Sequence, residues 1–430
     1  MSRMRVLVLS WEYPPVVVGG LGRHVHALVR ELAAAGHEVV VLARRETGTD
    51  AATHPTTDGP DPDDPRVRVL HVAEDPAHLR FSDDMVAWVL AMGHALLRAA
   101  LTRLADWRPD VVHAHDWLVA HPAIALADTL GVPLVATIHA TEAGRHGGWL
   151  TTPLSRQVHS IEWWLARRAD AVVTCSRAMR AEVATLFDLD PDTISVVHNG
   201  IAPRRWSVPP AATEAARRRW APGDVPLLAY FGRLEYEKGV QDLIAALPRI
   251  RRAHPGTRLV VAGTGTQQQM LVDEARRHRV RRSVRFAGHL TDDDLAALLT
   301  AASAVVLPSR YEPFGIVALE AAAAGAPLVA STAGGLGEVV VDGVSGVSFA
   351  PGDVAGIAGA VRRVLDNPDA AHERARVARA RLVPDFGWPV IAVRIAEIYA
   401  TAPAGGAIEA GRPKIPTGNV LSAGDLTPPR

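Results

Sequence analysis

The sequence contains a single cysteine, Cys175, which excludes a disulfide within the chain and fits a reducing compartment. A lone cysteine is more often a small buried apolar residue than a nucleophile. Net charge is also absent, because 46 basic residues balance 46 acidic ones. A chain without a net positive field is a poor partner for nucleic acid. We therefore expect a cytoplasmic protein that does not bind nucleic acid.

Long apolar runs are lacking as well. The longest stretch, residues 85–101, contains His94 and Arg98 and falls short of the roughly 20 uninterrupted apolar residues that a membrane span needs. The apolar run near the N-terminus covers only Val6 to Leu9, and no small-residue cleavage site follows it. We interpret this run as a first β-strand and expect no membrane span.

Lysine is scarce, since it occurs only at Lys238 and Lys414 and all other basic residues are arginine. A composition that favours arginine makes the compact ammonium of Lys238 informative. Metal-ligand patterns such as HxxxH and CxxC do not occur, and no pair of aspartates lies at a convincing strand end. The sequence therefore predicts no metal.

What the chain does have is a regular alternation of short apolar segments and helical patterns. RVLVLS, a helical stretch at residues 21–35 that stops at Gly36, and HEVVVLA make one β-α-β unit. Further strands are predicted at PDVVHAH, PLVATIHA and DAVVTCS in the first half, and at LLAYFGR, RLVVAGTG, VRFAGH, AVVLPS and PLVAS in the second. Near-continuously apolar strands separated by helices form parallel sheets covered on both faces. The 430 residues suffice for two domains of ordinary size. We predict an α/β fold with two doubly wound, Rossmann-like domains.

The domain boundary is expected near residues 201–225, where prolines and arginines replace strand periodicity. The predicted domains are residues 1–200 and 201–385. Two such domains facing each other would form a cleft, which is a common place for a small-molecule site. A polar insert at residues 45–64 is interpreted as a mobile loop, and residues 401–430 as a disordered tail.

Ligands of doubly wound sheets bind beyond the carboxyl ends of the strands. In the first half, Gly19 and Gly20 precede a helix, where backbone amides can approach a phosphate, although a tight turn without a ligand explains them equally well. HAHDW places His115 and Asp116 at a strand end, and TIHATEAGRH does the same for His139. Each histidine alone also fits a core or surface position without a ligand.

In the second half, FGRLEYEKG places Arg233 and Lys238 on one strand-to-helix loop. Two cations there can neutralise a diphosphate as charge develops on its leaving oxygen. The alternative is a surface charge pair with Glu235 or Glu237.

The most specific element is PSRYEPFGIVALEAAAAG, which sets Glu312 in a loop and Glu320 inside the following helix. A carboxylate in an alanine-rich, buried helix is costly without a partner, and a ribose diol would supply one. In the next loop, STAGGLGEVV, Glu338 fits ligand contact and simple helix capping equally well.

In combination, GRLEYEKG and EPFGIVALE resemble the motifs of glycosyltransferase family 4, the large retaining family that contains bacterial glycogen synthases. The resemblance covers residues 4 to 400, and VVHAHDW and TIHATE are similar to the actinobacterial glycogen-synthase-like α-1,4-glucosyltransferases. It implies the two-domain GT-B fold, hexosyltransferase activity and no cofactor beyond a nucleotide-sugar co-substrate. It also implies that a last helix, within residues 386–400, returns to the N-terminal domain.

The resemblance also implies roles for individual residues. Arg233 and Lys238 would bind the donor diphosphate, Glu320 the ribose and Glu312 the sugar hydroxyls. His139 would contact the transferred sugar, and Asp116 would line the acceptor side. The implied catalytic residues are His139, Glu312, Arg233, Lys238 and Asp116. The implied donor-binding residues are Gly19, Gly20, Arg233, Lys238, Pro313, Phe314, Gly315, Ile316, Val317 and Glu320. One departure is VVVGGL, where glycogen synthases commonly have the lysine of KTGGL.

The resemblance implies transfer of glucose from ADP-glucose or UDP-glucose, with retention. The acceptor would be an α-1,4-glucan, either glycogen-like or a methylglucose polysaccharide, or glucose 1-phosphate. The alternatives are transfer of mannose or N-acetylglucosamine to a lipid or small molecule, and sugar-nucleotide epimerisation. A phosphorylase would need a lysine for pyridoxal phosphate, and neither lysine fits that role. The sequence does not predict the oligomeric state.

Overall fold

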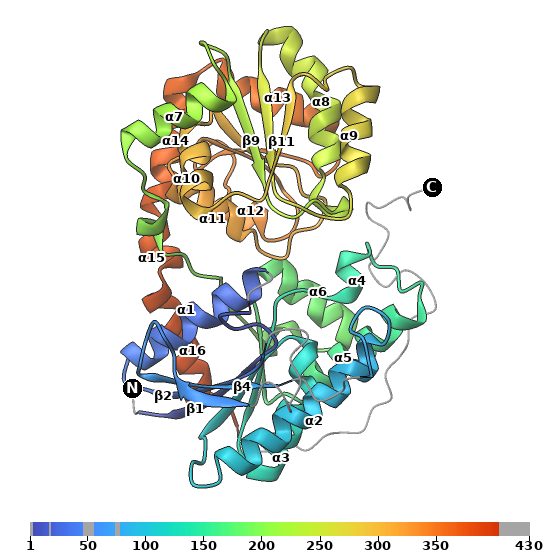
Figure 1. Cartoon of the computed structure of the whole chain (residues 1–430), viewed down its shortest axis with the longest axis vertical. Coiled ribbons are helices and arrows are strands. Elements are labelled where there is room, and N and C mark those ends of the chain that lie inside the picture. The colour runs from blue at the N-terminus through green and yellow to red at the C-terminus, as the bar shows by residue number, and fades with distance from the viewer. Residues whose placement is uncertain (1–2, 17–18, 46–55, 74–77, 404–430) are drawn as a thin grey trace. The chain divides into compact units, whose positions relative to one another are not determined.

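The computed structural model describes residues 3–16, 19–45, 56–73 and 78–403. The chain forms two compact units, which Figure 1 colours by residue number. The first unit comprises Met1–Gly200 and the segment from Trp388 onward, and the second comprises Ile201–Gly387. The expected tail lies, from residue 404 on, outside the described residues.

The first unit is built on an eight-stranded sheet with the strand order β3-β4-β2-β1-β5-β6-β7-β8. All neighbouring strands are parallel except β3, which runs antiparallel to β4. The central strand β1 pairs with β2 on one side and with β5 on the other, so the strand order reverses at β1 and β5. This topological switch point is where open α/β sheets bind ligands. The strands are β1 (Arg5–Ser10), β2 (Glu38–Arg44), β3 (Thr57–Pro60), β4 (Val67–Val72), β5 (Val111–His115), β6 (Leu134–Ile138), β7 (Ala171–Thr174) and β8 (Ile194–Val196).

Helices cover both faces of this sheet. Alternate residues of β1 point to opposite faces, so Leu7 and Leu9 pack under α2 and α3, whereas Val6 and Val8 pack under α1 and α16. The C-terminal helix α16 therefore belongs to the core of the first unit. The helices are α1 (Gly20–Ala34), α2 (Met85–Arg103), α3 (Ala120–Leu130), α4 (Glu142–Arg145), α5 (Pro153–Arg168), α6 (Arg177–Phe187) and α16 (Trp388–Thr401).

Within the described residues, α2 has the length and apolarity that a membrane span would need. Its side chains Trp88, Met92 and Leu96 are nevertheless buried against the sheet in the core of the first unit. A core helix of an α/β unit passes the same length and composition test. Packing on the sheet therefore accounts for the apolar residues on one side of α2, whereas Leu90 and Leu101 are exposed.

The second unit has a six-stranded, fully parallel sheet in the order β11-β10-β9-β12-β13-β14. Its switch point lies between β9 and β12. The strands are β9 (Leu227–Phe231), β10 (Arg258–Ala262), β11 (Val284–Gly288), β12 (Ala304–Leu307), β13 (Leu328–Ser331) and β14 (Val347–Phe349). The helices are α7 (Pro210–Trp220), α8 (Val240–Ala253), α9 (Gln268–Arg277), α10 (Asp292–Ala301), α11 (Ile316–Ala323), α12 (Leu336–Val339), α13 (Val354–Leu365), α14 (Pro368–Ala380) and α15 (Leu382–Phe386).

The predicted pair of doubly wound α/β units is confirmed, but the polar insert is only partly a loop. Residues 46–55 lie outside the described residues, whereas Thr57–Pro60 forms the edge strand β3. Two carboxylates of the turn after β3, those of Asp61 and Asp64, are buried. The Tyr13 hydroxyl donates to Asp61 at 2.7 Å, and Asp61 accepts the backbone N–H groups of Asp63 and Asp64. The sequence interpretation overlooked that an acidic turn can pack when its carboxylates are satisfied.

Candidate active site

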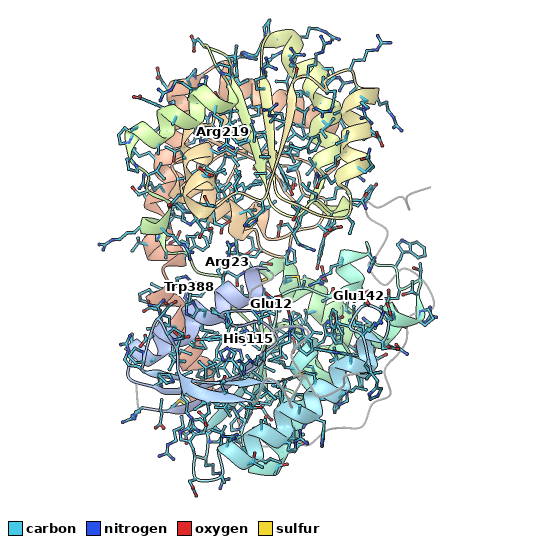
Figure 2. All side chains as sticks on the ribbon, in the orientation of Figure 1. Glu12, Arg23, His115, Glu142, Arg219 and Trp388 are labelled. Atoms are coloured by element: carbon cyan, nitrogen blue, oxygen red, sulfur yellow. The ribbon has the colours of Figure 1, made fainter. Side chains whose placement is uncertain are left out.

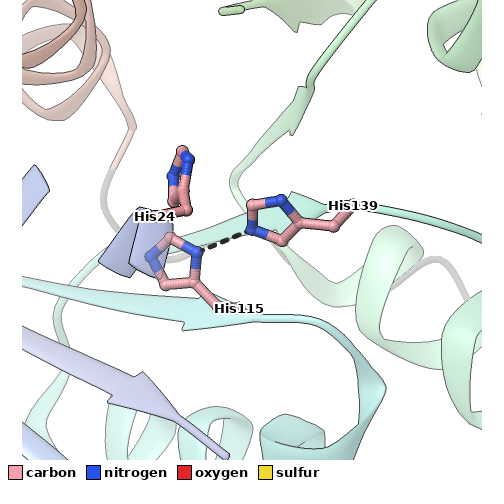
Figure 3. A group of neighbouring side chains, drawn as sticks. All are labelled: His24, His115 and His139. Atoms are coloured by element: carbon pink, nitrogen blue, oxygen red, sulfur yellow. Dashed lines mark hydrogen bonds between the residues drawn. The ribbon is translucent and has the colours of Figure 1, made fainter. Parts of the chain in front are cut away.

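The first candidate site lies at the switch point of the first unit, where β5 and β6 end. His115 is the last residue of β5, and His139 follows β6 directly. Because parallel neighbours end at the same edge, the two rings meet: Nδ1 of His115 lies 3.0 Å from Nε2 of His139. Figure 3 shows this hydrogen bond.

A third histidine, His24, comes from α1 and completes what we call the histidine cluster (Figure 3). Its ring centroid lies 4.7 Å from that of His139 and 5.6 Å from that of His115. His24 and His115 are buried, and His139 is half-buried. The sequence analysis missed His24, although a polar residue on the apolar face of an amphipathic helix was a usable signal.

The histidine cluster is supported from α16. Behind it, the two ring nitrogens of His113 lie 2.7 Å from the Tyr399 hydroxyl and 2.7 Å from Oγ1 of Thr137. The ring of Trp388 lies 5.2 Å from that of His24. Figure 2 labels His115 and Trp388 among the side chains of the first unit. The C-terminal helix thus fixes the side chains at this sheet edge.

Burial makes these imidazoles neutral. It lowers the pKa of His139 to about 4 and that of His113 to about 3. It also lowers the pKa values of His24 and His115 well below 6.5, and repulsion from the neighbouring histidines adds to the effect. At neutral pH the histidine cluster therefore offers uncharged hydrogen-bonding groups rather than positive charge.

Asp116 fixes the segment that carries His139. Its carboxylate accepts the backbone N–H of His139 at 2.7 Å, and its own N–H donates to the carbonyl of Thr137. Its backbone adopts φ 63° and ψ 173°, a region that non-glycine residues rarely occupy and that costs about 1 to 3 kcal/mol. Burial raises the pKa of Asp116 to about 6, although the hydrogen bond from His139 opposes this shift. The strain is consistent with a functional position.

The loop after β1 that contains Gly19 binds a carboxylate of the protein itself. The backbone N–H of Gly19 donates to Oε2 of Glu12 at 2.9 Å, and Gly20 begins α1. Figure 2 labels Glu12, which the sequence analysis did not single out. A phosphate that used the Gly19 amide would have to replace this carboxylate. The loop is thus able to hold a negatively charged oxygen, as expected for an amide at a helix N-terminus.

The second candidate site lies at the switch point of the second unit, where the loops after β9 and β12 meet. Nζ of Lys238 lies 2.9 Å from Oε2 of Glu312, and the two side chains are only 14% and 12% exposed. The Ser309 hydroxyl donates to the same carboxylate oxygen at 3.3 Å. Two residues that the sequence analysis named separately therefore form one ion pair.

Glycines make this close approach possible. Gly239 has φ 68°, and a Cβ atom there would lie 1.9 Å from the carbonyl oxygen of Pro308. Gly315 has φ 101° and precedes α11, and a Cβ atom on it would lie 2.7 Å from the Leu336 side chain. A larger residue at Gly239 would force apart the loops that carry Lys238 and Glu312, and one at Gly315 would displace the Leu336 side chain of α12.

Arg233 does not join this ion pair. Its side chain is 58% exposed, and Nη2 lies 3.4 Å from Oε1 of Glu237, which is the surface pair considered as the alternative. An exposed ion pair of this kind contributes at most about 1 kcal/mol, so Arg233 can exchange Glu237 for another anion. The other acidic residue considered, Glu235, accepts a hydrogen bond from the backbone of Thr266 instead.

The remaining predicted residues of the second unit lie just before α11, within α11 and in α12. Glu320 is buried within α11, which begins at Ile316, so a carboxylate does lie inside an apolar helix. Phe314 is buried, and its ring lies 6.1 Å from that of Phe386. Glu338 lies in the short helix α12. The half-buried residues Pro313, Ile316 and Val317 complete this segment.

Groups suited to metal binding occur in two places among the described residues, both in the first unit. One is the histidine cluster, in which one nitrogen of each ring lies within 4.8 Å of the others. The second comprises His26, Asp61 and Asp63. The sequence analysis missed both, because their members come from separate segments and form no compact motif.

Comparison with known proteins supports this division into two units. Residues 18–205 match the family described as Glycosyltransferase Family 4, and residues 213–381 match Glycosyl transferases group 1. The chain is 59% identical to a protein named glycogen synthase from Mycobacterium tuberculosis, over 94% of this chain and 96% of the relative. It is 32% identical to alpha-maltose-1-phosphate synthase from Mycolicibacterium smegmatis, over 92% of this chain and 99% of that protein.

Among solved structures, sucrose-phosphate synthase from Thermosynechococcus elongatus has the same fold, with a TM-score of 0.78 at 23% identity over 93% of this chain and 98% of that one. The chain therefore belongs to glycosyltransferase family 4 and is a glycosyltransferase of the GT-B fold.

Proposed function

We propose that the protein transfers glucose, with retention of configuration, from ADP-glucose or UDP-glucose to an α-1,4-glucan. The half-buried Lys238–Glu312 ion pair carries this proposal, because it joins the two loops whose motifs resemble the donor site of glycogen synthases. The 59% identity to a protein named glycogen synthase supports glucose as the transferred sugar.

In the donor complex, Lys238 and Arg233 bind the diphosphate. Lys238 is held in place by Glu312 before the donor arrives, so little conformational freedom is lost when phosphate binds. The exposed Arg233 leaves Glu237 and adds a second cation. Glu312 then accepts hydrogen bonds from sugar hydroxyls, and Glu320 accepts them from the ribose.

In the transfer step, the β-phosphate leaves with the electron pair of its bond to the anomeric carbon, and Lys238 and Arg233 stabilise its charge. His139 stays neutral and holds the transferred sugar through a hydrogen bond. The acceptor hydroxyl attacks the same face of the oxocarbenium-like sugar, and a phosphate oxygen takes the hydroxyl proton. Asp116 orients His139 through its backbone and lines the acceptor side. No metal takes part in this scheme.

A glycogen-like glucan, a methylglucose polysaccharide and glucose 1-phosphate share the same donor chemistry. The relative named alpha-maltose-1-phosphate synthase supports including glucose 1-phosphate. The runner-up is transfer of mannose or N-acetylglucosamine to a lipid or small molecule. VVVGGL lacks the lysine of KTGGL, so the phosphate charge is left to Arg233 and Lys238.

Purified protein should be incubated with ADP-, UDP- or GDP-sugars and either malto-oligosaccharides or glucose 1-phosphate, and nucleotide release and product mass recorded. We expect extension of the oligosaccharide by units of glucose, with ADP-glucose or UDP-glucose as donor. Conversion of the sugar nucleotide without any acceptor would identify an epimerase. Turnover only with other sugars and acceptors would establish the runner-up.

A further inference from the structure

We propose that His24, His115 and His139 form a binding site for a divalent transition metal such as zinc, and that an occupied site is inactive in sugar transfer. Metal binding follows from geometry alone. The loss of activity rests on the role proposed for His139 above, because a ring nitrogen that coordinates a metal no longer bonds to the sugar.

The ring positions suit a tetrahedral ion. Zinc binds imidazole nitrogen at about 2.0–2.1 Å, which places the ring centroids of three tetrahedral ligands about 5 Å apart. The centroid separations in the histidine cluster are 4.7, 5.4 and 5.6 Å. One nitrogen of each ring lies within 4.8 Å of the others, so small ring rotations bring all three to a common ion. Figure 3 shows the three rings as neighbours, with the hydrogen bond between His115 and His139.

The available atoms also suit a transition metal. Three imidazoles without a carboxylate make a ligand set that zinc, copper and nickel prefer over magnesium or calcium. The half-buried His139 leaves one side of the cluster open for entry.

Coordination needs no net loss of protons. In the hydrogen bond between His115 and His139, one ring donates its N–H to the lone pair of the other. When both nitrogens turn to the metal, the donating ring carries its proton on its second nitrogen instead. Each neutral ring then gives one lone pair to the ion, and water fills the fourth position.

The three ligands are held by rigid elements. His115 ends the central strand β5, and His24 lies on α1 against Trp388. The backbone of His139 is fixed by the Asp116 carboxylate. Preorganised ligands lose little freedom on binding, which raises affinity.

The second group suited to metal binding allows a comparison within the same unit. His26 contributes one imidazole, whereas Asp61 and Asp63 contribute carboxylates, and the Asp63 side chain is 63% exposed. Asp61 already accepts hydrogen bonds from Tyr13 and from two backbone amides. This group is therefore the weaker ligand set for zinc, and His26 is the matched control position.

The test uses the full chain with no affinity tag, freed of metal by a chelator. Cobalt(II) is titrated and followed by visible absorption, and zinc is then added to displace it. We expect one tight site with the intense absorption of four-coordinate cobalt in the wild type and in His26→Gln. In His24→Gln we expect binding weaker by about a hundredfold or more, since removing even an outer partner of a ligand costs 10- to 100-fold.

His139→Gln is the second variant, because its half-buried position makes misfolding less of a concern than at the buried His24. Cobalt binding should weaken in this variant as well. The proposal would be overturned if His26→Gln lost the cobalt absorption while His24→Gln and His139→Gln kept it. A wild type without a four-coordinate cobalt spectrum would also overturn it.

The second readout is sugar transfer with and without zinc. Zinc should inhibit the wild type and His26→Gln at the concentration that fills the site, and a chelator should restore activity. In His24→Gln, the metal site should have a higher dissociation constant. The zinc concentration that gives half-inhibition should rise by the same factor. Full activity with the site filled would overturn the inhibition. If the protein transferred no sugar at all, the proposed function would fail, and the cobalt titration would still decide on the site.

Discussion

The two candidate sites occupy the same topological position in their units but differ in charge. Each lies beyond the carboxyl ends of the strands where the strand order of a parallel sheet reverses. In the first unit, burial keeps four histidines neutral. In the second unit, Lys238 and Glu312 remain a close ion pair with little exposure.

This difference suggests that the two sites bind different groups of the substrates. A neutral cluster offers hydrogen bonds to a sugar without attracting anions, whereas a lysine next to an acidic partner can be redirected to a phosphate as its charge develops. The protein thus places its neutral groups where hydroxyls are expected and its charged groups where the diphosphate is expected.

The largest effect should come from removing the cation of the second site. Lys238→Ala should lower kcat/KM by about 30-fold to about 1000-fold, the equivalent of roughly 2 to 4 kcal/mol of transition-state stabilisation. Steady-state kinetics measures this loss. Arg218→Ala, which breaks an exposed ion pair with Glu214 on α7, is the control and should leave kcat/KM unchanged. Unaltered turnover in Lys238→Ala would remove this lysine from the mechanism.

Next in size is the effect of the glycine that lets the two loops of the second site touch. Gly239→Ala should destabilise the second unit by about 3 kcal/mol, because a Cβ atom would collide with the Pro308 carbonyl and φ is 68°. Gly343→Ala is matched for backbone strain, with φ 74°, but its Cβ atom meets nothing within 4 Å. It should cost only about 1 to 2 kcal/mol. Equal losses in denaturant unfolding would show that the loop contact is unimportant.

The smallest effect, expressed per pH unit, concerns the pH dependence of stability in the first unit. In the unfolded chain His113 takes up a proton near pH 6.5, whereas in the folded chain its pKa is about 3. The unfolded state therefore binds more protons below pH 6.5, and the stability that the neutral ring provides is lost as the pH falls. Asp116 acts in the opposite direction, since its folded pKa of about 6 exceeds its ordinary value of 3.8.

His113→Asn should therefore flatten the fall of the unfolding free energy between pH 6.5 and 4, by up to about 1.4 kcal/mol per pH unit. Denaturant titrations at several pH values measure this slope. His94→Asn, at an exposed position on α2, should retain the wild-type slope. Parallel curves for His113→Asn and the wild type would mean that this ring titrates normally.

Much of the fold was predictable because its signals are local. The strand of RVLVLS, the helix after it and Gly36 as its end were clear from hydrophobic periodicity, and β1 and α1 occupy those positions. Four strands were not anticipated: β3, β4, β8 and β14. β3, β8 and β14 lie at sheet edges, and β8 and β14 have only three residues each, so their apolar patterns are weak. β4 has six residues with a recognisable apolar pattern, VRVLHV, and was overlooked.

The two sites differ in how much their sequence revealed. Lys238 and Glu312 lie in compact motifs, so their individual importance was predictable, although their ion pair depends on how two loops pack. The histidine cluster is assembled from α1, β5 and the segment after β6, and no spacing rule links these elements. His24 and Glu12 were missed for this reason, since only the fold brings each of them to its neighbours.

The central claim is transfer of glucose with retention of configuration. Proton NMR of the first linkage formed from an α-linked nucleotide glucose and a malto-oligosaccharide, in the presence of a chelator, tests it most directly. The account predicts an α-1,4 linkage, recognised by the small coupling of its anomeric proton, at an undiminished rate. A β linkage, or loss of transfer that manganese restores, would contradict it.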